Sequence, residues 1–441
     1  MSLNAAVIGG GISGLASAVR IAGLGHRVTL YESESALGGL GTTFPYRDTH
    51  LERFYHCILP GDTALLRHIA ELGLGPELLW RKTRMGFMYR GRIYPLNTAW
   101  DLLRFAPLTL TERVRMGWIG LRARTHGMSP ELDQITAADW LRGMAGEHAF
   151  EILWKPLLSA KIGDPYQSLP ALWVSSRMHR EKSTGPETKG CLRRGYRSLI
   201  DAFERRLRQG DARIRLATPV VEIERHGEIL GVRLADGRRE AHDYVVATSP
   251  LVQFQRLTAG LGLDASITGL GLDYQGVVSG VFLMKQALSP YYWMPFVDSG
   301  ATAQGAIEMS NLVPLERAGG LHVIYLVNYT HRDHAFFQQD DATLLRLYRE
   351  DLERLFPGAG ASVVDQFLFR APFVEPIWTL DYARAKPPTS VIPGRLYLAC
   401  TAQLYPRVNS WNSCCEVVDG MMPGLASETA AAQAARRAAC A

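Results

Sequence analysis

The beginning of the chain alternates short apolar runs with glycine-rich turns. Residues 5–8 form an apolar run that is typical of a buried parallel strand, and residues 26–31 form a second one. Between them, residues 13–22 carry small and aliphatic side chains in the pattern of a helix packed against a sheet. The pattern therefore predicts a βαβ unit at the beginning of the chain.

The pattern changes after this unit. Residues 62–74 favour a helix that stops at Gly75-Pro76, and residues 80–97 alternate as strands do. Leucines, tryptophans and arginines then recur at roughly helical spacing, so further helices are expected over residues 100–124 (with a break at Pro107), 137–144 and 149–158. This stretch is predicted to form a helical substrate domain.

From Arg194 onward the pattern of the first unit returns. An amphipathic helix and two strands precede an Asp236-Gly237 turn and an apolar strand over residues 244–247. Residues 266–385 alternate aromatic and β-branched positions, which predicts a sheet, and the chain then closes with a strand, a loop and a helix. We therefore predict one nucleotide-binding domain from residues 1–75, 190–265 and 386–441, and a substrate-binding domain from residues 76–189 and 266–385.

Composition excludes several classes of protein. The 441 residues carry 48 Lys and Arg against 43 Asp and Glu, a net charge of +5, without a sustained basic block, a zinc-type Cys/His spacing or a tandem repeat, so we expect no nucleic-acid partner and no metal. We expect no export signal and no membrane-spanning run, and a cytoplasmic location with peripheral membrane contact left open. The six cysteines are scattered, as in a reduced compartment: Cys57, Cys191, Cys400, Cys414, Cys415 and Cys440.

The first turn has the spacing G-x-G-x-x-G, formed by Gly9, Gly11 and Gly14. In such a turn the first glycine permits the tight bend, the second lets a diphosphate approach the main chain at the helix N-terminus, and the third permits close packing of helix and strand. Glu32 follows the second strand and is placed to accept hydrogen bonds from a ribose hydroxyl. The motif predicts an adenine dinucleotide as ligand.

Four stretches resemble the FAD-dependent amine oxidase, protoporphyrinogen oxidase and phytoene desaturase superfamily, to which UDP-galactopyranose mutase is related. They are VIGGGISGLASAVRIAGLGHRVTLYESESALGG, GCLRRGYRSLIDAFERRLRQGDARIRLATPVVEIE, YVVATSP and GRLYLACTAQLYPRVNSWNSCCEVVDG. The resemblance implies an α/β fold with a discontinuous, Rossmann-like FAD-binding domain of glutathione-reductase type and an inserted α+β substrate domain. It also implies the FAD-contacting residues Gly9, Gly11, Ile12, Ser13, Gly14, Glu32, Ser33, Gly38, Gly39, Leu40, Val220, Thr248, Thr401, Asn412 and Ser413.

The sequence departs from this superfamily at two positions. Cys400-Thr401 stands where the superfamily usually has Gly-Asp, so the Thr401 hydroxyl or the main chain is expected to replace the aspartate contact. Leu40 stands where many members have arginine. The helix beginning near Asn412-Ser413 is expected to point its positive end at the flavin; the alternative is that it is only the last structural helix.

Several polar residues are candidates for the substrate site, each with a structural alternative. Tyr55 and His56 lie in the THLERFYHCI stretch that leads toward the flavin edge, and His56 is either a proton carrier or a hydrogen-bonded core histidine. Lys161 is predicted to hold a water or an anionic substrate, although a lysine there can also extend to solvent. A cationic and aromatic group for a carboxylate or phosphate, or alternatively a solvated hairpin, is formed by Arg84, Arg92 and Tyr94. Further pocket candidates are Asn328, Tyr329 and Tyr405.

These expectations combine into a functional hypothesis. We expect an FAD-dependent oxidoreductase that removes two electrons from a C–N or C–C bond of a small organic substrate through flavin N5, as in amine oxidation or desaturation. One alternative is a redox-neutral flavin enzyme acting on a sugar nucleotide, to which the GRIYPLN stretch and its arginines point; another is a non-catalytic FAD-binding scaffold. Residues 100–124 combine aromatics, leucines and arginines, which suits either a membrane surface or core-facing helices.

Overall fold

The computed structural model describes residues 2–180, 187–227 and 229–440. Its first sheet has six strands from three distant segments of the chain, in the order β19 (Ser390–Ile392), β20 (Leu396–Leu398), β13 (Tyr244–Ala247), β1 (Asn4–Ile8), β2 (Arg27–Tyr31) and β9 (Arg213–Arg215). All neighbours are parallel except β19 and β20. Ile8 is in register with Tyr31 on one side and Ala247 on the other, so three strand ends meet at the first glycine turn.

The two faces of this sheet have different covers, because alternate side chains of β1 point to opposite faces. Ala5 and Val7 pack with three helices: α1 (Ile12–Gly23), α9 (Tyr196–Gln209) and α16 (Trp411–Cys440). Ala6 and Ile8 pack in the core with an antiparallel sheet of β10 (Val220–His226), β11 (Ile229–Leu234) and β12 (Arg239–His242). This arrangement confirms the α/β fold class that the resemblance implies.

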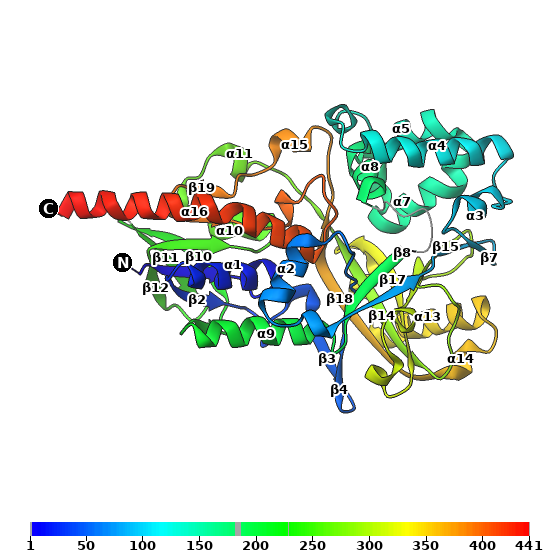
Figure 1. The fold of residues 1–441 in the computed structure, drawn as a ribbon, viewed down its shortest axis with the longest axis horizontal. Helices are drawn as coiled ribbons and strands as arrows, with labels where there is room; N and C mark the ends of the chain where they lie inside the picture. Colours follow the sequence, from blue (N-terminus) through cyan, green and yellow to red (C-terminus); the bar gives the residue numbers. More distant parts are fainter. Residues whose placement is uncertain (1, 181–186, 228, 441) are drawn as a thin grey trace.

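A second sheet of seven strands forms the other end of the molecule (Figure 1). Its order is β18 (Val363–Pro376), β14 (Tyr274–Met284), β17 (His322–His331), β16 (Gly305–Glu308), β15 (Trp293–Val297), β6 (Gly86–Tyr89) and β7 (Arg92–Pro95). One face packs against α13 (Asp341–Leu355), and the other packs against a hairpin of β3 (Thr43–Tyr46) and β4 (Thr49–Glu52). Every residue of β14 is buried, as expected for the centre of a covered sheet.

A group of helices lies between β7 and β8 (Glu187–Leu192) in the chain. Strand β8 pairs with β5 (Leu78–Thr83) in a two-stranded ribbon. The members of the helical group include α3 (Ala99–Leu103), α4 (Leu110–His126), α5 (Ala137–Ala145), a π-helical turn (Phe150–Trp154), α7 (Lys155–Ile162) and α8 (Ala171–Arg180). The predicted break at Pro107 is confirmed, because it lies between α3 and α4. Helix α8 was not predicted from the sequence.

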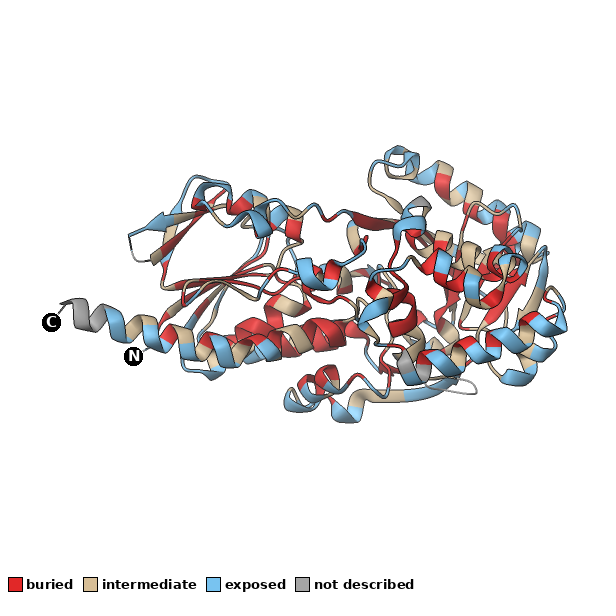
Figure 2. Ribbon diagram, turned by 90° about the horizontal axis from the view of Figure 1, so that it is seen from above, coloured by how far each residue is buried: buried red, intermediate tan, exposed pale blue. Residues whose placement is uncertain are grey.

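Short elements complete the fold: α2 (Thr63–Glu71), α6 (Glu147–Ala149), α10 (Leu251–Leu257), α11 (Ala265–Thr268), α12 (Ala335–Gln338), α14 (Ala359–Ser362) and α15 (Tyr382–Ala385). Helix α16 is buried where it begins and becomes exposed along its length toward the C-terminus (Figure 2). Within the described ranges, no helix combines the length and the apolar character needed to cross a bilayer. The cytoplasmic location stays a prediction.

Candidate flavin and substrate site

One large cavity, of about 1330 Å³, reaches from the first glycine turn to the seven-stranded sheet. Its walls come from the ends of β1 and β2, from α7 and α8, from β14, β17 and β18, and from the beginning of α16. This volume exceeds the range of about 300–1,000 Å³ that is typical of sites for one drug-sized ligand. The cavity is therefore large enough for a cofactor together with a substrate.

The glycine turn leaves the main chain bare at one end of the cavity. A Cβ on Gly14 would lie 1.8 Å from the carbonyl oxygen of Gly9, so a side chain there would separate α1 from β1. A Cβ on Gly11, in contrast, would meet only the Cα of Gly39 at 3.9 Å, which leaves open space in front of the main chain. The N-cap residue of α1 is Gly11, which has no side chain to cap the helix. Its N–H groups and the positive end of its dipole are thus available to a diphosphate.

Glu32 supports this turn from the end of β2. One carboxylate oxygen accepts a hydrogen bond of 2.6 Å from the Gly10 N–H, and the other accepts bonds from the Glu34 N–H and the Ser33 hydroxyl. The side chain is buried but still lines the cavity. The position is compatible with the predicted ribose contact, and the hydrogen bonds show that the same carboxylate also shapes the glycine turn.

Most of the predicted cofactor residues come together on this cavity. Those that line it are Gly9, Gly11, Ile12, Ser13, Glu32, Ser33, Gly38, Gly39, Leu40, Val220, Thr248 and Thr401. Gly14 lies behind the wall, in the contact between helix and strand. The Thr401 hydroxyl, at the position of the unusual Cys400-Thr401 pair, lies 3.4 Å from the hydroxyl of Tyr274.

Asn412 and Ser413 do not line the cavity, although the beginning of α16 does, so the predicted approach of this helix N-terminus to the flavin stays a prediction. The Asn412 side-chain oxygen accepts hydrogen bonds from the N–H groups of Ala64 and Leu65, so it caps α2. The Ser413 hydroxyl donates to the carbonyl oxygen of Val408. Both groups are used within the protein because α2 packs against the beginning of α16.

These features fit FAD. The uncapped helix, the bare glycine main chain and the carboxylate after β2 match its diphosphate and ribose, and the cavity continues past Gly39 and Leu40 with room for the isoalloxazine ring. Among the described residues, no group of three or more His, Cys, Asp or Glu side chains could hold a metal ion.

Charged groups are concentrated at the other end of the cavity. Lys161 of α7 lies 3.9 Å from Glu375 of β18, and Arg177 of α8 forms an ion pair of 3.0 Å with the same carboxylate. The Lys161 ammonium also lies 3.8 Å from the centre of the Tyr329 ring, and the Arg177 guanidinium lies 3.9 Å from the centre of the Trp173 ring. Burial lowers the pKa of Lys161 to about 8, although Glu375 opposes that shift.

Tyr55 and His56 both line the cavity, and both side chains are held by hydrogen bonds within the protein. Tyr55 shares a hydrogen bond of 2.6 Å with the hydroxyl of Tyr329, and burial raises the pKa of Tyr55 to about 12, so it stays protonated at neutral pH. His56 donates from Nδ1 to the carbonyl oxygen of Phe54, and burial lowers its pKa below the ordinary value, which favours the neutral ring. Its ring packs against Tyr196 and Trp411.

The remaining candidates divide between the cavity and other places. Arg84 is exposed and lines the cavity, whereas Arg92 and Tyr94 lie outside its lining, with the Arg92 guanidinium over the Tyr94 ring. Asn328 bonds to Thr302 and Tyr348 in the core behind the sheet. Tyr405 donates to Asp133 and is likewise buried away from the cavity.

Sequence reasoning missed Glu375, Arg177 and Trp173. Their signal was weak, because each is a single polar or aromatic residue in an otherwise apolar or mixed segment, and the partners are about 200 positions apart in the chain. A carboxylate within the apolar run FVEPIW is the feature that could have indicated a buried ion pair.

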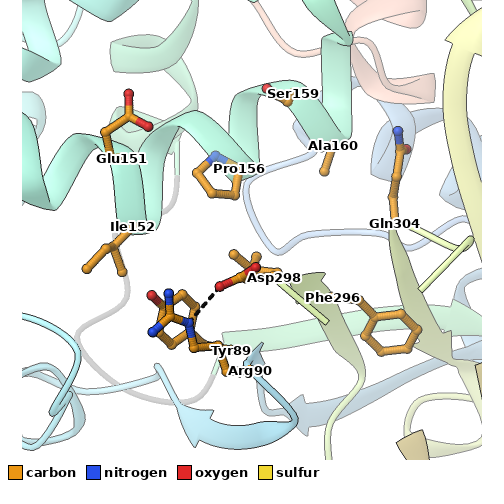
Figure 3. A pocket seen from close by; sticks show the side chains of 11 residues that line it. Tyr89, Arg90, Glu151, Ile152, Pro156, Ser159, Ala160, Phe296, Asp298 and Gln304 are labelled. Carbon is orange, nitrogen blue, oxygen red and sulfur yellow. Dashed lines mark hydrogen bonds and ion pairs between the residues drawn. The ribbon is translucent and has the colours of Figure 1, made fainter. Parts of the chain in front are cut away.

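A smaller pocket of about 550 Å³ lies beside the main cavity (Figure 3). Ala160 and Gln304 line both, so the two spaces adjoin at these residues. Arg90 and Asp298 form an ion pair of 2.6 Å across the smaller pocket (Figure 3), and both side chains are exposed to solvent. The pocket is open, and its ion pair is weak for that reason.

Comparison with solved structures supports this description of the fold. The chain is similar to an oxidoreductase from Methanosarcina mazei, with a TM-score of 0.75, 16% identity, and coverage of 96% of this chain and 100% of that one. It is also similar to cyclohexylamine oxidase from Brevibacterium oxydans IH-35A, with a TM-score of 0.77, 13% identity, and coverage of 97% and 100%. At these identities the likeness establishes the fold.

Sequence comparison adds relatives that are desaturases. The chain is 24% identical over 184 residues to zeta-carotene desaturase of Zea mays, covering 35% of this chain and 31% of that protein. It is 25% identical over 298 residues to the neurosporene-forming phytoene desaturase of Rhodobacter capsulatus, covering 56% and 52%. The matches thus span about half or less of the length of these relatives.

The sequence model of one family, described as flavin containing amine oxidoreductase, matches residues 12–399. That range includes the beginning of α1, all the charged residues of the cavity and the strand β20. The chain therefore belongs to the flavin containing amine oxidoreductase family.

Proposed function

We propose that this protein is an FAD-dependent oxidoreductase that removes two electrons from a C–N or C–C bond of a small organic substrate. The observation that carries the proposal is the continuity of one cavity, which joins the bare glycine turn to the Lys161–Glu375–Arg177 group. Because both ends open into the same space, a cofactor held at the first can meet a substrate held at the second.

The residues proposed to hold FAD act mainly through the main chain. The Gly11 main chain and the N-terminus of α1 bind the diphosphate, Glu32 orients the adenosine ribose, and the Thr401 hydroxyl is available to the ribityl chain. Bound FAD supplies a two-electron acceptor. Around it the protein supplies a wall of aromatic side chains that excludes water, which includes Tyr55, Tyr329 and Trp411.

The charges at the substrate end favour one class of substrate. Lys161 and Arg177 share a single carboxylate, so the group carries a net positive charge while Lys161 is protonated. This positive charge would repel a protonated amine. A carboxylate on the substrate would instead neutralise it. We therefore propose a substrate that carries an anionic group, bound by Lys161 and Arg177 while its oxidisable bond points toward the flavin.

The redox-neutral alternative has weaker support. It rested on the GRIYPLN stretch and its arginines; Leu96 and Asn97 of this stretch line the cavity, but its arginine, Arg92, does not. Family membership and the desaturase relatives support net oxidation instead. The scaffold alternative is addressed by the experiment that follows.

The experiment is anaerobic reduction of the FAD-loaded enzyme by a panel of hydrophobic carboxylic acids, amino acids and amines. We expect loss of the yellow flavin absorbance with at least one anionic compound, and a rise in KM of about tenfold or more in Lys161→Met. Lys155→Met is the matched control, because Lys155 is on the same helix but pairs with Glu151 in solvent. A protein that takes up no FAD contradicts the proposed cofactor, and reduction by amines alone contradicts the proposed substrate class.

A further inference from the structure

Helix α4 is apolar on two opposite faces. Its inner face packs into the core through Met116, Ile119 and Ala123, all buried. Its outer face carries Leu110, Val114, Trp118 and Leu121, which are 65%, 62%, 58% and 52% exposed. Their spacing of four, four and three residues places them on a single stripe of the helix. A soluble protein rarely leaves such a stripe in water without a partner for it.

Helix α3, which packs against α4, adds two more exposed apolar side chains, Trp100 and Leu103. The two helices are fastened together by Arg113 of α4, which donates to the carbonyl oxygens of Leu103 and Leu108. We name as the α3–α4 face the exposed residues Trp100, Leu103, Leu110, Val114, Trp118 and Leu121.

The charge around the α3–α4 face is positive and not neutralised. Residues 99–126 contain five arginines and two acidic residues. Both acids are already engaged, since Asp101 closes the capping box with Thr98 and Glu112 closes the one with Thr109 while it pairs with His148. In the described part of the chain, no carboxylate pairs with the exposed Arg104, Arg115 or Arg122. Arg104 lies over the Trp100 ring at 4.6 Å.

We propose that the α3–α4 face docks onto a bilayer surface that contains anionic lipid. Helices that lie in a membrane interface carry tryptophan and leucine on one side and arginines beside them. The apolar side chains enter the boundary of the acyl chains, and the arginines bind lipid phosphates. A second copy of the chain is a poorer occupant, because a two-fold interface would bring the same unpaired arginines together. A lipid headgroup supplies the opposite charge.

The docked face lies close to the substrate end of the cavity. Leu96 and Asn97 line the cavity, and Thr98, the next residue, caps α3. Docking would therefore hold the region between the cavity and α3 near the bilayer. The proposal does not depend on the proposed function, because vesicle binding is measured without turnover.

The test is flotation of the full-length, FAD-loaded protein with two kinds of vesicle, phosphatidylcholine alone and a 7:3 mixture with phosphatidylglycerol. At low salt we expect the protein to float with the mixed vesicles and to remain in solution with the neutral ones. The triple variant Leu110→Ser/Val114→Ser/Trp118→Ser should lose at least tenfold in binding. Arg115→Gln/Arg122→Gln should lose roughly fivefold per arginine, an effect that high salt removes.

The control variant is Val364→Ser/Leu380→Ser, which removes two exposed apolar side chains, each 38% exposed, from other parts of the chain. It should bind vesicles as the wild type does, and all variants should keep the flavin spectrum. Absence of flotation with mixed vesicles, or equal losses in the control and the triple variant, would overturn the proposal. So would a concentration-dependent dimer in sedimentation that Trp118→Ser makes monomeric, because the face would then bind a second copy.

Discussion

Gly14 illustrates how a single residue controls the cofactor end of the cavity. The Cβ of any other residue would lie 1.8 Å from the Gly9 carbonyl oxygen, and that atom belongs to the backbone, which has little freedom to move. The main chain that faces the diphosphate is only two to three residues away. A change at Gly14 should therefore disturb both stability and FAD binding.

We predict that Gly14→Ala lowers the free energy of unfolding by about 1–3 kcal/mol or more, through overpacking, and weakens FAD binding at least tenfold. The matched control is Gly23→Ala at the other end of α1, where a Cβ would meet no atom within 4 Å. That variant should be neutral or stabilised by up to about 1 kcal/mol, because alanine has the higher helix propensity. Chemical denaturation and FAD titration measure the two effects, and equal behaviour of the two variants would contradict the packing argument.

We propose that Lys161 titrates at the end of the cavity where the substrate is proposed to bind. Its ammonium lies 3.9 Å from Glu375 and 3.8 Å from the centre of the Tyr329 ring, and burial lowers its pKa to about 8 from an ordinary value of 10.5. Below pH 8 the group is charged and attracts an anion. Above pH 8 it loses the proton, and with it that attraction.

We predict that the affinity of the FAD-loaded enzyme for benzoate, read from the flavin spectrum, is level at low pH and falls as the pH rises through about 8. Glu375 stabilises the Lys161 ammonium, so Glu375→Gln should move the midpoint to lower pH. The same variant should bind benzoate more tightly below pH 7, since one competing carboxylate charge is gone. Two results would exclude Lys161 as the titrating group. One is a pH midpoint of benzoate affinity that does not move in Glu375→Gln, and the other is loss of that midpoint in the control Lys155→Met.

At the scale of elements, the beginning of α16 serves as a structural support for α2. The Asn412 side-chain oxygen accepts from two N–H groups of the first turn of α2, and its amide nitrogen donates to Glu416 one turn further along α16. The contact therefore joins two helices that are about 350 residues apart in the chain.

We predict that Asn412→Leu lowers the free energy of unfolding by about 1–3 kcal/mol, because two buried N–H groups lose their acceptor. Asn412→Asp keeps an acceptor oxygen and should lose less. FAD affinity should change by less than threefold in Asn412→Asp, as expected if the side chain acts as a cap. A large loss of FAD binding in Asn412→Asp, with melting unchanged, would instead restore the direct flavin contact.

At the scale of the whole molecule, the cavity depends on segments from nearly the full length of the chain. Its walls include residues between Ile8 and Cys414, and both sheets contribute. No single segment can form the site, so cofactor binding is linked to folding of the complete molecule. The domain bounds proposed from the sequence stay a prediction.

We predict that FAD raises the melting temperature of the apoprotein in proportion to the logarithm of its concentration, because it binds only the folded form. At one hundred times its Kd, the stabilisation should be about 2.7 kcal/mol. FMN lacks the adenosine and the second phosphate that the glycine turn and Glu32 are proposed to bind, so it should stabilise much less at equal concentration. Equal stabilisation by FMN and FAD in thermal denaturation would contradict the assignment of the glycine turn.

The sequence by itself determined those parts of the protein whose conformation depends on residues close together in the chain. The G-x-G-x-x-G spacing, the apolar strands over residues 5–8 and 244–247 and the break at Pro107 are all local patterns, and local sterics and burial decide what they form. This is why the α/β fold, and the grouping of most predicted cofactor residues on one cavity, were predictable.

Only the tertiary structure decided which distant polar groups meet. The Lys161–Glu375–Arg177 group forms because α7, α8 and β18 pack around one cavity, and an isolated charge in a sequence does not indicate its partner. Asn412 caps α2 because α2 packs against the beginning of α16, a contact that no local pattern in the sequence shows. The α3–α4 face was also ambiguous in sequence, because a helix with two apolar faces shows which one is buried only after it has packed.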